Sequence, residues 1–459
     1  MCCNCCNRSY KNIFLKLTAA LAMAVAAPGV WGADLSFGGS RAIAVNAEAS
    51  TGLDKIYVVE NAVGATISYP SASASWSKWG NTGAAYAEPV AATVEGNNTV
   101  YRIADNEDFG ITVEDADGRM HHFRIVNYAA HHVEFSDLSF NEEDSDCMSL
   151  YINVIPLSPN ENYAITYYTI NGVPRTLDRQ YVLRYSTLAY DENAKAYNPV
   201  DKEVHYESLN DAIRVEKPLC DTQFSLSGDR FADEWGYAAS AVSPTYITNA
   251  VEAYTYAEKD ERDNDNEQKD DATPLGGSAP VDISFVAAVT DAAQFTEWQL
   301  SKSPDFESFE LRFNQTELDY SFTEYGTWYM RFQASNADGS CDYFSPVYEI
   351  FVGESKLVCP NAFSPGASEG VNDVWKVSYK SIVDFECHIF NRWGTKIISF
   401  SDPSQGWDGK YNGKLVPPGV YYYVIKARGA DGHKYDLSGD INIIGFRQGN
   451  GQSSGSETE

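Results

Sequence analysis

Basic residues are scarce in this chain of 459 residues, because 34 lysines and arginines stand against 64 aspartates and glutamates, a formal net charge of −30. Such an excess repels a phosphate backbone, so it excludes nucleic-acid binding as the main role and suits a well-solvated surface. The excess is uneven: residues 33–354 hold 20 basic and 53 acidic residues, while 355–446 hold 10 and 9. The C-terminal part is therefore predicted to be a separate unit with partners of its own.

Long hydrophobic runs are also missing, apart from one near the N-terminus. In residues 1–32, the basic residues Arg8, Lys11 and Lys16 precede an uncharged apolar stretch from Leu17 to Val30. This is the pattern of a cleavable signal peptide, and the stretch is shorter than the ~20 residues that span a bilayer. The mature chain is expected to have no transmembrane segment and to be extracellular or at the cell surface, with the periplasm as the alternative.

Cysteine is sparse, and four of the nine cysteines lie in the predicted signal peptide. The other five are an odd number in a chain whose export makes disulfides permissible. Cys220–Cys341 and Cys359–Cys387 are the preferred pairs, which leaves Cys147 over. The connectivity stays open, because sequence alone does not determine it.

Signatures of catalysis and of cofactor binding are absent from the sequence, which has no P-loop, no dinucleotide fingerprint and no HExxH zinc motif. His121, His122, His131 and His132 are close in sequence and would suit a transition metal if they shared one face. Histidines on half-exposed strands are the simpler interpretation. No catalytic residue, no metal ligand and no cofactor is therefore predicted.

Aromatic residues recur in short runs that are separated by turn signals, and the chain has 30 Tyr and 22 Phe. No long stretch after the signal peptide has a helical period, so an all-β fold of tandem Ig-like sandwiches is predicted. The expected segments are a signal peptide at 1–32, Ig-like sandwiches at 33–134, 135–217 and 218–354, a small antiparallel sandwich at 355–446, and a disordered tail at 447–459.

The third sandwich is expected to contain an acidic insertion at 258–272. Within it, Asp263–Glu267 alternates carboxylates with amides, like the start of a calcium loop. However, Gln268 stands where an EF-hand requires glycine, and the closing glutamate is missing. A solvated charge run is therefore the favoured interpretation.

Later in the same sandwich, Glu324–Tyr329 and Asn336–Cys341 resemble the late strands of PKD-type Ig-like domains. The resemblance implies that Trp298 is a core residue of an earlier strand. It also implies that Tyr329 is a tyrosine-corner residue.

The C-terminal segment has the most specific pattern in the chain. Its motifs follow in the order Cys359–Pro365, Gly370–Trp375, Ile389–Gly394, Gly406–Gly409, Pro418–Tyr423 and Gly439–Ile444. Together they resemble the gliding-motility-associated C-terminal domain, a type B cargo domain of the type IX secretion system in Bacteroidota-type bacteria. The resemblance implies a sorting domain that directs export and does no chemistry.

The same resemblance identifies a sorting-domain motif, whose members are expected to build the fold that the secretion machinery recognises. Gly394 is expected to take a turn conformation that other residues avoid. Trp393 and Trp407 are expected to be core or edge-covering side chains. The motif consists of Asn391, Arg392, Trp393, Gly394, Gly406, Trp407, Asp408, Gly409, Gly419 and Tyr421.

The predicted product is an exported, multi-domain cell-surface protein without enzymatic activity, which has a binding, adhesion or structural role. Residues 355–446 are expected to contact the outer-membrane secretion machinery. The loops of the other sandwiches are expected to meet an extracellular protein or glycan of unknown identity. The alternative is a secreted hydrolase of extracellular polymers with the same sorting domain, which requires a cleft with paired carboxylates.

Overall fold

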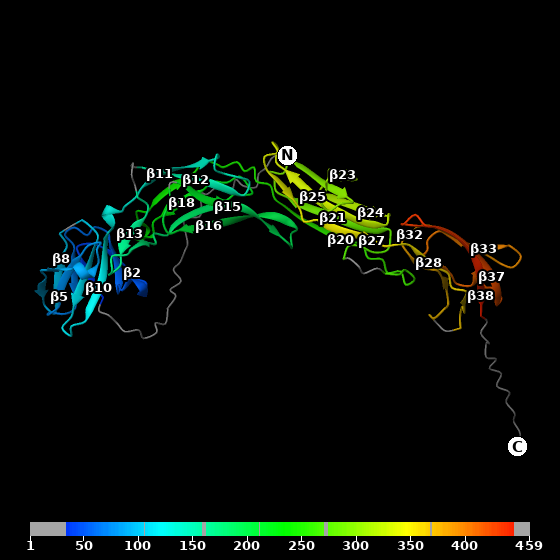
Figure 1. Cartoon of the computed structure of the whole chain (residues 1–459), viewed down its shortest axis with the longest axis horizontal. Helices are drawn as coiled ribbons and strands as arrows, with labels where there is room; N and C mark the ends of the chain where they lie inside the picture. The colour runs from blue at the N-terminus through cyan, green and yellow to red at the C-terminus, as the bar shows by residue number, and fades with distance from the viewer. Residues whose placement is uncertain are drawn as a thin grey trace, which may run out of the picture. The chain divides into compact units, whose positions relative to one another are not determined.

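Strands dominate the computed structural model of the chain, which describes residues 34–104, 106–157, 162–210, 212–269, 274–367 and 370–444 (Figure 1). The predicted all-β fold is confirmed, since the one α-helix of the described part is α1 (Arg230–Trp235). No helix in these segments is both long and apolar enough to cross a membrane. The predicted signal peptide and the predicted tail lie outside the described residues.

The chain divides into two compact units. The first consists of Met1–Ala189 and Asn198–Ala250, and the second of Tyr190–Tyr197 and Val251–Glu459. The described residues of the first unit form a first module (34–132) and a second module (133–189 and 198–250). The second unit contains a third module (251–353) and a fourth module (355–444).

Two sheets enclose the core of the first module. Ile67, Ile111 and Ile125 have no exposed surface and lie in one apolar cluster, as expected for strands that bury alternate residues. One sheet has the order β1 (Ser36–Gly38), β4 (Thr66–Tyr69), β8 (Asn98–Arg102) and β7 (Thr93–Glu95). The other has the order β2 (Ala42–Asn46), β3 (Lys55–Val59), β10 (Met120–Asn127), β9 (Phe109–Glu114), β5 (Ser75–Trp79) and β6 (Glu88–Val90). Three 3₁₀ turns are η1 (Ala49–Thr51), η2 (Ala84–Tyr86) and η3 (Tyr128–Ala130).

The second module also consists of small sheets around one core. One sheet has the order β11 (Phe135–Asn141), β12 (Ser149–Pro156) and β17 (Ala212–Glu216). A second has the order β16 (Ala196–Tyr206), β15 (Tyr181–Asp191), β18 (Ser225–Gly228) and β19 (Ala239–Val242). The hairpin pair is β13 (Ile165–Tyr168) with β14 (Pro174–Leu177).

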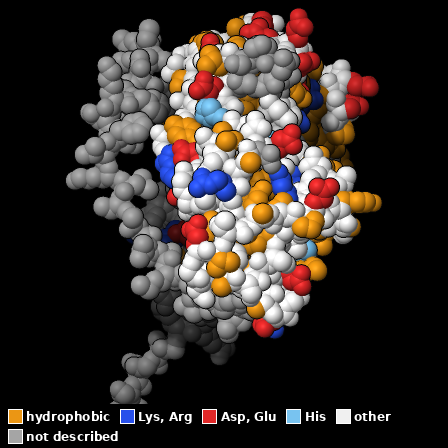
Figure 2. Space-filling view, turned by 90° about the vertical axis from the view of Figure 1, so that its left-hand side faces the viewer, with side chains coloured by type: hydrophobic (Ala, Val, Ile, Leu, Met, Phe, Trp, Pro, Cys, Tyr) orange, Lys and Arg blue, Asp and Glu red, His pale blue; other side chains and the backbone are white. Residues whose placement is uncertain are grey.

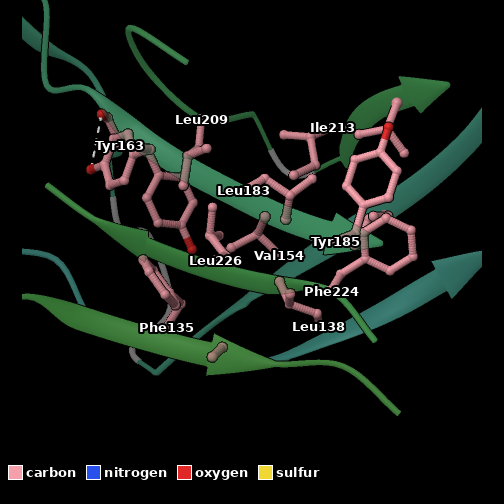
Figure 3. Close-up of a cluster of buried hydrophobic side chains, with 14 of the residues drawn as sticks. Phe135, Leu138, Val154, Tyr163, Leu183, Tyr185, Leu209, Ile213, Phe224 and Leu226 are labelled. Carbon is pink, nitrogen blue, oxygen red and sulfur yellow. Dashed lines mark hydrogen bonds between the residues drawn. The ribbon is translucent and has the colours of Figure 1, made fainter. Parts of the chain in front are cut away.

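The predicted boundary after residue 217 is wrong, because the second module continues to about Ala250. Leu226 of β18 lies opposite Leu183 of β15. Phe224 and Leu226 therefore share a core with Leu138 and Val154 (Figure 3). The turn signal at Lys217-Pro218 marks the end of β17, and a turn has the same composition whether or not a domain ends there.

A second apolar core joins the first module to the second module. Val58 and Trp79 of the first module lie in one buried cluster with Ile165 and Phe231 of the second module. The two modules are therefore packed together, because separating them would return these side chains to water.

A buried ion pair lies beside this shared core. The side chains of Arg179 and Asp229 have no exposed surface, and Arg179 Nε donates to Asp229 Oδ2 at 2.5 Å. The Tyr128 hydroxyl of the first module donates to Asp229 Oδ1 at 2.9 Å, and Arg179 Nη2 donates to the carbonyl oxygen of His131 at 2.9 Å. Burial and the nearby charge of Asp229 raise the pKa of Tyr128. Both modules thus supply partners to these two charges.

The third module is a sandwich with Trp298 at its centre. Trp298 is fully buried, and its ring centroid lies 5.3 Å from that of Phe285 and 5.0 Å from that of Phe332, which confirms the predicted core position. One sheet has the order β20 (Ala253–Lys259), β21 (Val281–Val289) and β24 (Glu317–Phe322). The other contains β23 (Leu311–Phe313), β22 (Phe295–Ser301), β25 (Gly326–Ser335), β26 (Asp342–Phe344) and β27 (Tyr348–Val352).

Tyr329 is not the predicted tyrosine-corner residue. The neighbouring Trp328 makes the equivalent hydrogen bond to a backbone oxygen upstream. Trp328 is buried, and its Nε1 donates to the backbone oxygen of Glu324 at 3.1 Å, four residues upstream. Tyr329 is only half-buried, since successive side chains of a strand point to opposite faces of the sheet.

The acidic insertion is not a solvated loop in its described part. The side chain of Glu267 is only 7% exposed and pairs with Arg262 at 2.7 Å. Glu267 also forms a strand-like bridge with Tyr379 of the fourth module. Composition misled the prediction because the amide groups of a hydrophilic segment pair with a sheet edge as well as those of an apolar one.

The fourth module has one large sheet and three small strand pairs. The large sheet has the order β29 (Ala362–Phe363), β38 (Lys434–Ile443), β37 (Gly419–Gly429), β32 (Ile382–Phe390) and β33 (Lys396–Phe400). The pairs are β28 (Lys356–Val358) with β31 (Ser378–Lys380), β30 (Trp375–Lys376) with β34 (Gly406–Trp407), and β35 (Lys410–Tyr411) with β36 (Lys414–Leu415).

The preferred disulfide pairs are not formed. Cys147 and Cys341 each take part in a disulfide, whereas Cys220, Cys359 and Cys387 are outside any disulfide. The predicted pairs Cys220–Cys341 and Cys359–Cys387 are therefore wrong. Order along the chain cannot select a pair, because a disulfide requires a narrow range of Cα separations and side-chain directions.

Asp229→Ala is expected to lower the free energy of unfolding of the first unit by about 3–5 kcal/mol, since Arg179 would stay buried without its counter-charge. Urea denaturation of the full chain, followed by tryptophan fluorescence, measures this change. The matched control is Glu203→Ala, which removes the exposed Arg184–Glu203 pair of the same unit and is expected to cost less than ~1 kcal/mol. Equal shifts for the two variants would contradict the prediction.

Cys387 is expected to resist alkylation in the folded chain. It has no exposed surface, and burial, together with the nearby Cys359, raises the pKa of its thiol to about 12. About one thiol in ten thousand would be ionised at pH 8, and the thiolate is the reactive form. Iodoacetamide labelling with mass mapping, with and without urea, tests this expectation. Labelling of Cys387 at the same rate in both conditions would disprove it.

Candidate functional site

The predicted sorting-domain motif divides into an exposed turn and a buried tryptophan site. The turn connects β32 to β33. Asn391 Oδ1 accepts hydrogen bonds from the backbone amides of Trp393 and Thr395, each at 3.0 Å. Gly394 has φ = 79°, the left-handed region that favours glycine, as predicted. Asn391 and Gly394 therefore determine the shape of this turn.

Trp393 points into solvent from the turn. It is 74% exposed, and the guanidinium of Arg392 lies 4.2 Å from the centroid of its ring. The expectation that Trp393 covers a core or an edge is therefore wrong. Because the turn is held by backbone and Asn391 contacts, the fold does not require a large apolar side chain at position 393.

Trp407 occupies the core, as predicted. It has no exposed surface, its Nε1 donates to the carbonyl oxygen of Lys410 at 2.9 Å, and its ring centroid lies 5.0 Å from that of Tyr421. Trp375 is its cross-strand partner in the β30–β34 pair and is also fully buried. The sequence motifs contained Trp375, but its role as the second core tryptophan was not predicted.

Small and acidic motif residues shape the chain around Trp407. A Cβ atom at Gly406 would lie 2.6 Å from the carbonyl oxygen of Trp375, so a larger residue does not fit there. Asp408 Oδ1 accepts from the backbone amide of Lys410 at 3.0 Å. Burial opposes the charge of Asp408, but the hydrogen bonds from Lys410 outweigh it, and the pKa of the carboxyl is lowered. Gly409 has φ = 75°, and it completes the turn.

Gly419 and Tyr421 lie at the start of β37. Gly419 has φ = 149°, and the Tyr421 hydroxyl donates to the carbonyl oxygen of Pro417 at 3.0 Å. Burial raises the pKa of Tyr421, and the charge of Arg392 partly opposes this rise. Tyr421 therefore packs against Trp407 of the buried site and lies close enough to Arg392 of the exposed turn for that charge to affect its pKa.

Exposed apolar side chains gather at the same end of the large sheet. Phe390 lies opposite Tyr422, and Val420 lies opposite Asn442. Cross-strand partners share a face, so these side chains form a row on the solvent side of the sheet. The row runs from β32 through β37 to the end of β38. We group this row with Trp393, which lies three residues beyond Phe390 in the β32–β33 turn, and name the group the open-face cluster. Its most exposed members are Trp393 at 74%, Ile444 at 58%, Tyr422 at 46% and Val420 at 43%.

The four clustered histidines contact protein groups in the first and second modules, and His121 Nε2 lies 3.7 Å from Asp115 Oδ2. His122 Nδ1 lies 2.9 Å from Thr112 Oγ1, and His131 Nε2 lies 2.7 Å from Asp108 Oδ2. The ring of His132 packs against that of Tyr237. Across the described residues, no group of three or more His, Cys, Asp or Glu side chains is placed to hold a metal ion.

Charged side chains do not collect into one patch on the face drawn in Figure 2. Acidic side chains are scattered there among polar, basic and hydrophobic ones. The surplus of acidic residues therefore acts as a distributed solvating charge on this face, without a concentrated binding site for a cation or a basic partner.

Two family models match parts of the chain. Residues 139–243 match a fibronectin type III domain, and residues 357–443 match the CHU_C type IX secretion signal domain. The first match extends across β18 and β19, in agreement with the longer second module. No curated protein matches the chain.

Several solved structures are similar to the chain at low identity. A tetra-tandem repeat in the extending region of a large adhesion protein is 11% identical over 84% of this chain and 97% of that one, with a TM-score of 0.22. Fibronectin(III)-like modules of Clostridium thermocellum CbhA are 13% identical over 44% of this chain and 100% of that one, with a TM-score of 0.18. Dimeric latent PorU from Porphyromonas gingivalis is 10% identical over 71% of this chain and 35% of that one, with a TM-score of 0.16.

The family matches agree with the motif geometry. The buried Trp375–Trp407 pair, the Asn391–Gly394 turn and the large sheet all lie within residues 357–443. The chain thus carries a fibronectin type III domain and, C-terminal to it, a CHU_C type IX secretion signal domain that marks it for export to the cell surface or the extracellular space.

Proposed function

We propose that the protein is a non-enzymatic surface protein that binds an extracellular protein or glycan, or acts as a spacer. The first three modules are the presented part, and the fourth module delivers them to the outer-membrane secretion machinery. The observation that carries this proposal is the secretion signal match at 357–443, together with an exposed tryptophan inside its motif.

The open-face cluster is the surface that we assign to recognition by the machinery. A tryptophan that is 74% exposed, three residues beyond Phe390, the cross-strand partner of Tyr422, is costly in water and is typical of a contact residue at a protein interface. The arginine next to it adds a charge that can pair with a partner's carboxylate. The remaining motif residues, such as Trp407 and Gly406, support this surface from within.

The binding role of the first three modules is supported by their construction. In the first unit, the packed modules hold their connecting loops on a common core, and rigid sandwiches with variable loops suit recognition. The large acidic excess of residues 33–354 favours solubility outside the cell and avoids association with anionic polymers.

The hydrolase alternative has one observation in its favour. A hollow of about 330 Å³ in the third module is lined by Asp260, Asp282 and Asp319 among other residues. However, Asp319 accepts a hydrogen bond from Ser284 at 2.6 Å, and Asp282 lies 3.8 Å from Arg262. These carboxylates line an open sheet face rather than a closed cleft, so the alternative ranks second.

Trp393→Ala is expected to reduce the surface-exposed fraction of the protein several-fold and leave its thermal unfolding unchanged. The side chain is exposed, and its removal creates no cavity. Protease shaving of intact cells, followed by immunoblotting, measures the exposed fraction. Circular dichroism of the purified variant measures the folding. Normal surface delivery of the variant would remove the open-face cluster as the recognition surface.

Trp407→Ala is the matched control in the same motif. Loss of this fully buried ring is expected to destabilise the fourth module by about 3–5 kcal/mol, since it leaves a cavity in the core. A lower unfolding temperature is therefore expected together with lower delivery. If Trp393→Ala lowered the unfolding temperature as much as Trp407→Ala, position 393 would have a structural role.

Deletion of residues 355–444 tests the sorting role as a whole. The truncated protein is expected to stay inside the cell envelope, protected from added protease, because the matched signal domain is missing. Surface exposure of the truncated chain at the level of the full chain would overturn the proposed function.

A further inference from the structure

The segment that joins the third module to the fourth is fixed at both ends. The backbone amide of Gly353 donates to the carbonyl oxygen of Gly277 at 3.0 Å, which holds the linker to the third module. The backbone amide of Ser355 donates to Asp431 Oδ2 at 3.0 Å, which holds it to the fourth module. The sorting module is therefore docked on its neighbour.

Part of the acidic insertion provides a second connection. We name residues 262–269 the strap. The backbone amide of Gln268 donates to the carbonyl oxygen of Tyr379 at 2.7 Å, and the backbone amide of Tyr379 donates to the carbonyl oxygen of Asn266 at 3.1 Å. The strap thus pairs with β31 as an added strand and covers an edge that would otherwise be open to other chains.

Side chains of the strap strengthen this pairing. Asn266 Nδ2 donates to the carbonyl oxygens of Val377 and Pro403, each at 2.8 Å. Lys376 Nζ lies 2.6 Å from Asp265 Oδ1. Asn266 is therefore the residue that connects the strap to two separate segments of the sorting module.

The buried Glu267 holds the strap in this conformation. Its carboxylate pairs with Arg262 at 2.7 Å and accepts from the Tyr379 hydroxyl at 3.2 Å. Burial opposes its charge, but hydrogen bonds from Arg262, Ser278 and Asn264 outweigh it and lower the pKa of the carboxyl. These contacts anchor the strap within the third module and hold its backbone in place beside β31.

A third connection lies at Ser381, which precedes β32. The backbone amide of Ser381 donates to Ser278 Oγ at 2.7 Å, and the backbone amide of Ala279 donates to Ser381 Oγ at 3.1 Å. Ser381 is fully buried with φ = 51°, a conformation that serine adopts rarely. The third module therefore supports a strained position at the start of the strand that leads to the Asn391 turn.

These contacts surround the tryptophan core of the sorting motif. Lys376, which meets Asp265, is adjacent to Trp375 in β30, and β30 pairs with β34 through Trp375 and Trp407. Val377 and Pro403, which Asn266 binds, lie on the two segments that lead away from and toward this strand pair. If the strap came away, both segments would lose the hydrogen bonds that Asn266 donates to them.

We propose that the strap couples the fold of the sorting module to the fold of the third module, so that the secretion machinery meets a complete sorting module only on folded cargo. The strap and the Ser278–Ser381 contact exist only when the third module has formed β20 and β21 on either side of them. This inference rests on the proposed sorting function of the fourth module and adds a folding condition to it.

The test compares Asn266→Ala with Asp263→Ala in the full chain. Asn266→Ala removes two hydrogen bonds to the sorting module. Asp263 is exposed in the same strap, and its substitution leaves those bonds in place. Hydrogen exchange with mass spectrometry is measured on the amides of 376–381 and on the peptide that contains Trp407. Two ordinary hydrogen bonds correspond to roughly tenfold to thirtyfold faster exchange.

The expected result is faster exchange and several-fold lower surface delivery for Asn266→Ala, with Asp263→Ala equal to the unchanged protein in both measurements. Unchanged exchange in Asn266→Ala would overturn the coupling. Faster exchange with normal delivery would overturn the folding condition but leave the sorting function intact. The sorting function itself fails only if the 355–444 deletion is delivered normally, so the two failures are distinguishable.

Discussion

The ion pair between Arg179 and Asp229 has no contact with water, so both charges depend entirely on protein partners. Those partners come from two modules, because Tyr128 and His131 belong to the first and Arg179, Asp229 and helix α1 to the second. A charge transferred from water into a protein interior is costly unless each of its hydrogen-bonding positions is satisfied. The first unit can therefore form only when both modules are folded and packed.

The sorting module depends on the third module in a similar way. At this junction, neutral hydrogen-bonding groups take the place of most of the charges. The strap and Ser278 bind backbone groups of the sorting module that would otherwise be unpaired, and the backbone amide of Ser355 in the linker donates to the Asp431 carboxylate. Within each unit, polar contacts join neighbouring sandwiches. Apolar contacts fill the individual cores and also reach the junctions, through a shared cluster in the first unit and through Val383 and Ala430 against the core of the third module in the second unit. Hydrogen bonds are directional, and this property fixes one relative placement of the modules inside a unit.

Two tryptophans of the sorting motif illustrate how one fold combines a stable core with the recognition surface that we propose. Trp407 lies inside the fourth module, and Trp393 extends from a turn that needs no large side chain. Exposed aromatic surface has a cost in a soluble protein and is retained where a partner covers it. The near-neutral charge of 355–446, beside the strongly acidic remainder of the chain, also fits a surface that approaches another protein.

The sequence by itself determined the all-β class, the position and type of the C-terminal module, and the core position of Trp298 and Trp407. Strand periodicity, turn residues and ordered motifs are local properties, and a local property can be read along the chain. Only the tertiary structure decided that β18 and β19 complete the second module, that Cys220, Cys359 and Cys387 are outside any disulfide, that Trp393 is exposed, and that the acidic insertion is a strap. Each of these features depends on which segment, distant in the sequence, packs beside the residues concerned. A turn signal has the same composition inside a domain as at its end, and an acidic segment has the same composition whether its amides bind water or a neighbouring strand.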